Sequence, residues 1–298
     1  MSEMPQASEI HSSVEASPAA TGPAGPLFEG QVGAYYLLSM LAGGEPRGLP
    51  GTTVTGIEFQ RASERPLDDV IVHATDAQAN PAVLEVQVKR TIDFTASDSV
   101  FRALVAQVAR AAAKPEFDTQ HYELAVATER TSTKIERSYQ EVLSWVRELG
   151  SAETFFKRLN QKRLANSDMR KFVENFRANL KLAGSPHDDA AVWRILRRFQ
   201  ILVFDFNQEG SATEILVRVR CGVLLAPEEA GKAGAFWQTL VGLTLESASK
   251  GGEKTRTQVR ETLVNEYHYG FAGESSFTTP APHFRKRPRA LCRIYPAR

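Results

Sequence analysis

Two short apolar segments joined by a polar turn constrain the fold of this chain more than any other feature. Residues 67–74 read LDDVIVHA, residues 76–81 read DAQANP and residues 82–90 read AVLEVQVKR. Apolar runs of this length, separated by Asn and Pro, are typical of two strands with a tight connection. The segments therefore predict an antiparallel hairpin near the middle of the N-terminal half.

The sequence around this hairpin predicts further elements of an α/β domain. Residues 27–43 place apolar side chains at helical spacing and end in Gly43-Gly44, which favours a helix with a glycine C-cap. Residues 53–60 alternate as a strand, with a bulge expected at Gly56. A helix over residues 99–113, capped by Asp98 or Ser97, and a strand over residues 121–128 complete the pattern. The order helix, three strands, helix, strand predicts an α/β sandwich over residues 27–130.

The remaining sequence is expected to be mostly helical. Residues 131–270 contain several amphipathic stretches, and one apolar run, residues 199–206, reads as either a buried strand or an extended linker. Residues 1–26 and 271–298 are rich in small, Pro or Arg residues and are expected to form a disordered tail and an irregular basic tail. The fold class is thus α/β, with a mostly helical second domain.

The location of the chain is suggested by what the sequence lacks. No apolar run approaches the ~20 residues that span a bilayer, and the first residues do not resemble a secretory signal. The only cysteines, Cys221 and Cys292, match no zinc spacing. These observations predict a cytoplasmic protein that does not enter a membrane.

The polar residues of the hairpin suggest metal-assisted cleavage of phosphodiesters. Because side chains alternate along a strand, Glu85, Gln87 and Lys89 share one face. A turn of this length lets Asp69 lie opposite Gln87 and Lys89. A carboxylate and an amide oxygen are suitable ligands for Mg²⁺, and a nearby ammonium group can hold or deprotonate a water and offset phosphate charge. The alternative is a solvent-exposed sheet face with an ordinary Glu85–Lys89 ion pair.

Asp69 followed by Gln87-Val88-Lys89 on consecutive strands resembles the PD-(D/E)XK nuclease superfamily. Gln in place of the usual acid is similar to Mrr-type restriction nucleases. The segments FEGQVGAYYLL and DDVIV…EVQVKR are also similar to the nuclease domain of CD-NTase-associated, Lamassu-type and STAND-type defence effectors. The resemblance covers about a third of the chain and implies a restriction-endonuclease-like fold. It further implies a Mg²⁺- or Mn²⁺-dependent double-stranded DNA endonuclease of anti-phage defence, acting as a homo-oligomer or with a sensor protein.

The resemblance also implies roles for individual residues. Asp69 and Gln87 match the metal-binding positions, and Lys89 matches the catalytic lysine. Glu29 matches an acid on the first helix of some members, and Gln107 a helical glutamine that steadies the site or contacts phosphate. Two alternatives stay open, since Asp68 lies beside Asp69, and Glu85 either compensates for the charge that Gln87 lacks or faces solvent.

Charge gives no global sign of a nucleic-acid partner. Lys plus Arg is 36 and Asp plus Glu is 35, a net charge of +1, so any such contact must be local. One cluster, expected within a single helix, suits phosphate contact: Lys157, Arg158, Lys162 and Arg163. A second cluster, Arg194, Arg197 and Arg198, suits it less. The competing functions are a catalytically inactive nuclease-like module that binds nucleic acid, and a helical assembly scaffold for a defence partner.

Overall fold

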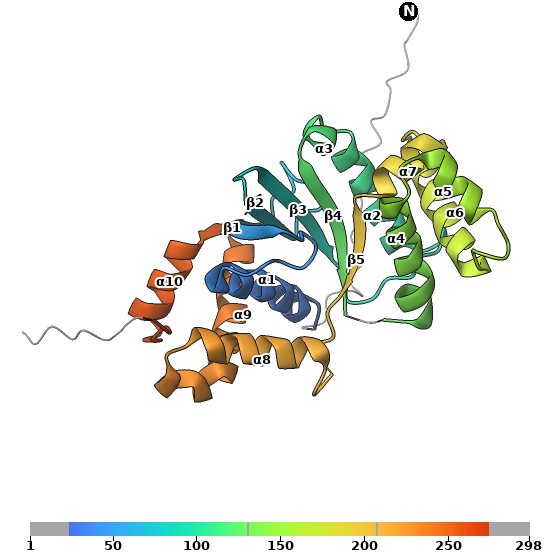
Figure 1. Cartoon of the computed structure of the whole chain (residues 1–298). Coiled ribbons are helices and arrows are strands. Elements are labelled where there is room, and N and C mark those ends of the chain that lie inside the picture. Colours follow the sequence, from blue (N-terminus) through green and yellow to red (C-terminus); the bar gives the residue numbers. More distant parts are fainter. Residues whose placement is uncertain (1–23, 130, 207, 274–298) are drawn as a thin grey trace, which may run out of the picture.

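The chain is built around one mixed β-sheet with helices on both faces (Figure 1). The computed structural model describes residues 24–129, 131–206 and 208–273, so the two predicted tails lie largely outside the described residues. Strand order in the sheet is β5-β4-β3-β2-β1-β6. The strands are β1 (Thr52–Phe59), β2 (Val70–Asp76), β3 (Pro81–Val88), β4 (His121–Thr128), β5 (Phe199–Val203) and β6 (Glu253–Thr255). The predicted α/β class is confirmed.

The hairpin predicted from the two apolar segments is confirmed as β2 and β3, which pair in antiparallel register with Val70 opposite Val86. Strand β1 pairs with β2 on the other side, and its register shifts between Val54 and Gly56, so a bulge lies next to the glycine. Strand β4 follows a helical crossover and lies parallel to β3. The first four strands therefore follow the predicted order.

Two strands come from the region expected to be mostly helical. The apolar run at residues 199–206 contains β5, which lies parallel to β4, so the strand alternative was correct. The short β6 pairs with β1 at the opposite edge and has no apolar signature in the sequence. The predicted boundary at residue 130 stays a prediction, and segments from both sides of it build the one sheet.

The helices divide into two layers, one on each face of the sheet (Figure 1). One layer contains α1 (Ala24–Ala42), α8 (Ala212–Leu224), α9 (Ala233–Ser249) and α10 (Arg256–Asn265), with a 3₁₀ segment at Pro227–Lys232. The other contains α2 (Ser99–Ala112), α4 (Gln140–Glu148), α5 (Ala152–Leu159), α6 (Ser167–Leu182) and α7 (Asp189–Leu196), with the short α3 (Glu116–Thr119) and a π-helical segment at Lys134–Tyr139. Within the described ranges, no helix is both long and apolar enough to cross a membrane.

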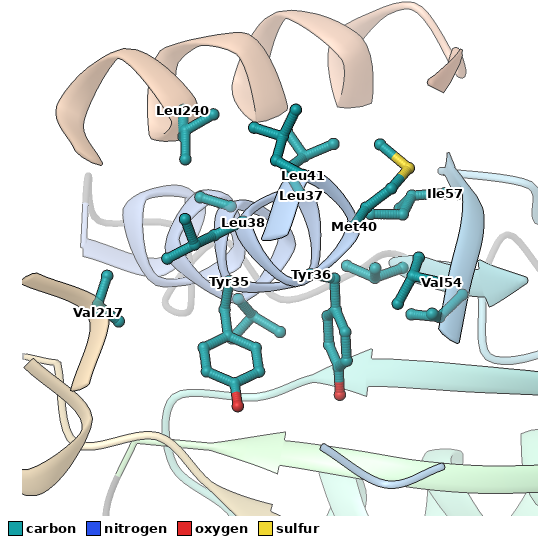
Figure 2. Close-up of a cluster of buried hydrophobic side chains, with 14 of the residues drawn as sticks. Tyr35, Tyr36, Leu37, Leu38, Met40, Leu41, Val54, Ile57, Val217 and Leu240 are labelled. Atoms are coloured by element: carbon teal, nitrogen blue, oxygen red, sulfur yellow. The ribbon is translucent and has the colours of Figure 1, made fainter. Parts of the chain in front are cut away.

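Helix α1 is buried on nearly all sides, which fixes its position relative to the sheet. Figure 2 shows its side chains packed toward Leu240 of α9, Val217 of α8 and Val54 of β1. Gly33 permits close contact with α9, since a Cβ at this position would collide with Thr244. At the C-terminus Gly43 adopts φ +62°, and Gly44 N–H donates to the Ser39 carbonyl at 3.1 Å. This is the predicted glycine cap, in the form of a Schellman motif.

Candidate metal centre at one end of the sheet

The three polar residues predicted from the hairpin meet where β2 begins and β3 ends. Asp69 directly precedes β2, and the β2–β3 register places it beside Gln87. Its Oδ2 atom accepts a hydrogen bond from the Val88 N–H at 2.7 Å and another from Gln87 Nε2. The Nζ atom of Lys89 lies 3.8 Å from the same oxygen. The structure therefore brings Asp69, Gln87 and Lys89 together around one carboxylate.

Gln87 is buried with one of its polar atoms unsatisfied. The residue is buried near the end of β3, and its Oε1 atom has no hydrogen-bond partner among the described residues. A buried polar atom without a partner costs roughly 1–3 kcal/mol. Such an atom is an oxygen ligand available to a cation.

Asp69 is also buried, with 8% of its surface exposed. Burial raises the pKa of its carboxyl group, while the Lys89 ammonium and the Val88 N–H act in the opposite direction. Asp68, the alternative ligand, is half-buried, and its backbone carbonyl accepts a hydrogen bond from Arg61. The structure therefore places Asp69, rather than Asp68, against Gln87 and Lys89.

A second carboxylate, Glu29, comes from the helix layer that contains α1. Glu29 lies near the start of α1, and its Oε1 atom accepts a hydrogen bond from Gln60 Nε2 at 2.6 Å. Burial and, to a lesser degree, the negative charge of Asp69 raise the pKa of Glu29 to about 7, although Gln60 and Lys89 act in the opposite direction. The charge of Asp69 therefore reaches Glu29, which places Glu29 within electrostatic range of the cluster. Beside Glu29 lies an open cavity of about 420 Å³, also lined by Pro26, Gln60, Leu245, Ala248, Ser249 and Gly251.

Gln60 is a site residue that the sequence reasoning missed. It follows β1 directly and adopts φ +53°, a left-handed conformation that is uncommon for residues other than glycine. In this conformation the side-chain amide of Gln60 donates its hydrogen bond to Glu29. The available signal was weak, since it consisted only of a polar residue directly after a strand.

Glu85 was expected either to compensate for the charge that Gln87 lacks or to lie on a solvent-exposed face, where it would pair with Lys89. Neither expectation was correct. The side chain is fully buried, so it neither faces solvent nor pairs with Lys89. It accepts hydrogen bonds from the Leu67 N–H at 3.2 Å and from the Tyr122 hydroxyl. Arg65 and Lys114 lie 3.5 and 3.6 Å from its Oε1 atom. With its charge balanced in this way, Glu85 does not compensate for the missing acid at Gln87.

The remaining predicted site residues make no hydrogen bond or ion pair to Asp69, Gln87 or Lys89 in the described part of the chain. Gln107 is half-buried on α2, and its side chain makes no hydrogen bond to the described residues. The expectation that the first basic cluster lies within one helix was wrong, because α5 ends at Leu159 and a turn follows it. Lys157 is exposed on α5 and Arg158 stacks on the Trp145 ring at 4.1 Å, while Lys162 and Arg163 are exposed in the turn.

The position of α5 separates this cluster from the candidate metal centre. The helix packs on α4 and α7 in the outer part of its layer, and Figure 1 shows it on the opposite side of the molecule from β2. Phosphate contact by these four residues stays a prediction, and it would occur away from Asp69.

The donor set suits a hard divalent cation such as Mg²⁺ or Mn²⁺. Asp69 and Glu29 offer carboxylate oxygens, and Gln87 offers the unpartnered Oε1, all of the type that Mg²⁺ prefers. Within the part of the chain that the structure describes, no group of three or more His, Cys, Asp or Glu side chains is arranged to hold a metal. A cation here would therefore depend on two carboxylates, one amide and water.

Together the fold and this centre describe an α/β sandwich with an acid–amide–lysine cluster at one end of the sheet. No family model and no curated protein matches the chain. Among solved structures, the chain is similar to a Cap4 receptor from Moraxella osloensis that contains a SAVED/CARF domain, with a TM-score of 0.41 and 9% identity over 83% of this chain. Two structures of the corresponding Acinetobacter baumannii receptor also match. The one with the cyclic trinucleotide 3′3′3′-cAAA has a TM-score of 0.41 and 9% identity over 82% of this chain, and the one with 2′3′3′-cAAA has 0.38 and 11% over 80%.

The likeness to these structures is distant. The matches cover 49% of the Moraxella chain and 44% of each Acinetobacter chain, so this chain spans about half of their length or less. At these TM-scores the similarity assigns no function, which has to be argued from the site itself.

Proposed function

We propose that this chain is a metal-dependent endonuclease that hydrolyses phosphodiester bonds of double-stranded DNA. The observation that carries the proposal is the convergence of Asp69, Gln87 and Lys89 at one end of the sheet, with Glu29 in the same electrostatic environment. A structural salt bridge alone would require neither a second carboxylate nor an unsatisfied amide oxygen.

Each residue has a distinct role in the proposed reaction. Asp69, Glu29 and the Gln87 Oε1 atom would hold the cation. When bound, the cation would activate a water and stabilise charge on the phosphoryl oxygens. Lys89 is partly exposed while its Nζ atom lies 3.8 Å from Asp69, so its ammonium group can reach both the cluster and a substrate phosphate. It would orient the attacking water and offset the developing negative charge, and cleavage would leave a 5′-phosphate and a 3′-hydroxyl.

The proposed setting is anti-phage defence, and its support is the resemblance of the opening helix and the β2–β3 hairpin to defence effector nucleases. In this proposal the chain acts as an effector that is controlled by self-assembly or by a sensor protein. Control of this kind suits an enzyme whose DNA substrate is also the genome of its host.

A plasmid-cleavage assay tests the proposed activity. Supercoiled DNA is incubated with the wild-type chain in Mg²⁺, in Mn²⁺ and in EDTA, and the same assay is run on Asp69→Ala and Lys89→Ala. Asp68→Asn is a matched control, because Asp68 is the adjacent acid but does not contact Gln87 or Lys89. Metal-dependent cleavage by the wild type and the control, and its loss in the two site variants, is the expected result. Equal cleavage by all four proteins would exclude this site.

A second candidate is a nuclease-like module that binds nucleic acid without cutting it. It is favoured by one observation, that Asp69 Oδ2 already has Val88 N–H, Gln87 Nε2 and Lys89 Nζ around it. Retained DNA binding with no cleavage in either metal would support this candidate. Neither binding nor cleavage would point instead to a helical assembly scaffold.

A further inference from the structure

A cluster of cationic side chains surrounds a cavity at the end of the sheet opposite the metal centre. The cavity has a volume of about 360 Å³ and is lined by His121, Glu123, Arg147, Arg197 and Arg198. His121 begins β4 and pairs with Ala82 at the start of β3, whereas Gln87 lies at the end of β3. The two sites are therefore separated by the length of a strand.

Two of the arginines are held rigidly by backbone carbonyls. Arg147 on α4 donates to the Leu143 carbonyl at 2.9 Å and to the Phe199 carbonyl at 2.6 Å. Arg198, after α7, donates through Nη1 to the Gln120 and Tyr122 carbonyls, both at 3.0 Å. These carbonyls satisfy individual N–H donors but carry no net charge. The guanidinium groups are thus positioned without being neutralised.

Glu123 is the one acidic residue that lines the cavity, and it balances only part of this charge. Its Oε2 atom lies 3.8 Å from Arg147 Nη2 and accepts a hydrogen bond from Gln200 at 2.9 Å. The neighbouring Arg194 already has its own partner, Asp118, at 2.7 Å. One carboxylate therefore faces three guanidinium groups.

Arg197 retains its hydrogen-bonding capacity. It is exposed at the end of α7, and its guanidinium group stacks on the Trp193 ring at 4.8 Å. Within the described residues its guanidinium group makes no hydrogen bond or ion pair, so its side-chain donors are free for a ligand. His121 is also exposed at the edge of the cavity and adds another donor.

We propose that this cavity binds a small phosphate-bearing ligand, with a phosphomonoester or a diphosphate as the chemical class. Guanidinium groups pair with phosphate oxygens through two parallel hydrogen bonds, and several of them around one point suit a multiply charged anion. A DNA duplex instead presents phosphates along an extended line, which favours cations spread over a surface. The cations here surround a single concavity. The proposal does not depend on the nuclease function.

Calorimetric titration with inorganic pyrophosphate tests the site, using the full chain in EDTA so that no metal contributes. The wild type is expected to bind, and its affinity is expected to fall as salt is raised. Arg197→Gln should weaken binding by at least about 10-fold, because it removes a charged partner of the anion. Arg197→Lys should lose less, and His121→Gln should weaken binding further when combined with Arg197→Gln.

Arg218→Gln is the matched control, since Arg218 is an exposed arginine on α8, on the opposite face of the sheet. It is expected to bind pyrophosphate like the wild type. No binding by the wild type, or equal binding by wild type and Arg197→Gln, would overturn the proposal. A duplex oligonucleotide is titrated in parallel. If only duplex binding depends on Arg197, the cavity is a nucleic-acid contact and the small-ligand proposal is wrong.

Discussion

Two buried carboxylates belong to the β2–β3 hairpin, Glu85 on β3 and Asp69 directly before β2, and their surroundings differ sharply. Glu85, opposite Ile71, is fully buried and has two cations, a tyrosine hydroxyl and a backbone N–H around it. Asp69, at the end of the same strand pair, has one cation at 3.8 Å and a second carboxylate, Glu29, within electrostatic range.

The comparison shows that burial of an acid does not by itself mark a functional site. What distinguishes the two regions is charge balance, because two cations compensate the single acid Glu85, whereas one cation, Lys89, serves the Asp69–Glu29 pair. A partly compensated pair of acids next to an unsatisfied amide oxygen has a cost in free energy, which a bound cation would offset. The Asp69 region is thus suited to chemistry and the Glu85 region to stability.

Substitution of Lys89 is expected to give the largest effect on activity. Lys89→Met keeps an apolar stem but removes the ammonium group, so the initial rate of plasmid cleavage should fall by about 10²–10⁴-fold. Glu85→Gln, assayed in parallel at a temperature where it stays folded, should retain cleavage. If Glu85→Gln is as inactive as Lys89→Met, the division between the two regions is wrong.

Substitution of Glu85 is expected to give the largest effect on stability. Glu85→Gln leaves Arg65 and Lys114 without their shared partner, and it should lower the free energy of unfolding by about 3 kcal/mol. Asp69→Asn should cost clearly less, since it also relieves repulsion with Glu29. Denaturant unfolding of both variants measures the difference, and a larger loss for Asp69→Asn would contradict the comparison.

Introducing an acid at position 87 should increase the difference in charge balance between the Asp69 region and the Glu85 region. Gln87→Glu gives the cluster a third carboxylate, so the Mn²⁺ affinity of the chain, measured by electron paramagnetic resonance of the free ion, is expected to rise by about 10-fold. The metal-free variant should also be less stable than the wild type. Unchanged or weaker Mn²⁺ binding would show that Gln87 does not face the cation.

The raised pKa of Glu29 predicts a smaller effect on folding stability, and the direction in which this effect changes with pH is defined. Between its unfolded pKa near 4.5 and its folded pKa of about 7, the folded state holds a proton that the unfolded state has released, so this group makes stability fall as the pH rises. Glu29→Gln removes the effect. The variant should melt like the wild type near pH 4.5 and about 2–4 °C above it near pH 8. A gap that is largest at low pH would contradict the assignment.

The sequence was informative where structure depends on neighbouring residues. The glycine cap after α1 and the bulge beside Gly56 arise from local chemistry and were predicted correctly, and the cap of α2 is Asp98, one of the two residues predicted for it. The meeting of Asp69, Gln87 and Lys89 was likewise accessible, because strand alternation and one short turn determine it.

Features that depend on distant partners were not predictable. Glu85 is buried because Arg65, Lys114 and Tyr122 surround it from other segments, and a strand pattern contains no information about them. The role of Gln60 requires α1 and the end of β1 to lie together. Strand β6 has three residues and forms only because β1 offers an unpaired edge.

The packing of α1 on α9 has a consequence for synthesis of the protein. Gly33 and Gly30 of α1 fit against Thr244 and Leu245, so the helix that carries Glu29 docks on a segment more than 200 residues later in the chain. A ribosome releases Glu29, Asp69 and Lys89 long before α9 emerges. The nascent chain therefore lacks the surface that holds Glu29 in place until α9 has been made, so the candidate site stays incomplete during the earlier part of translation.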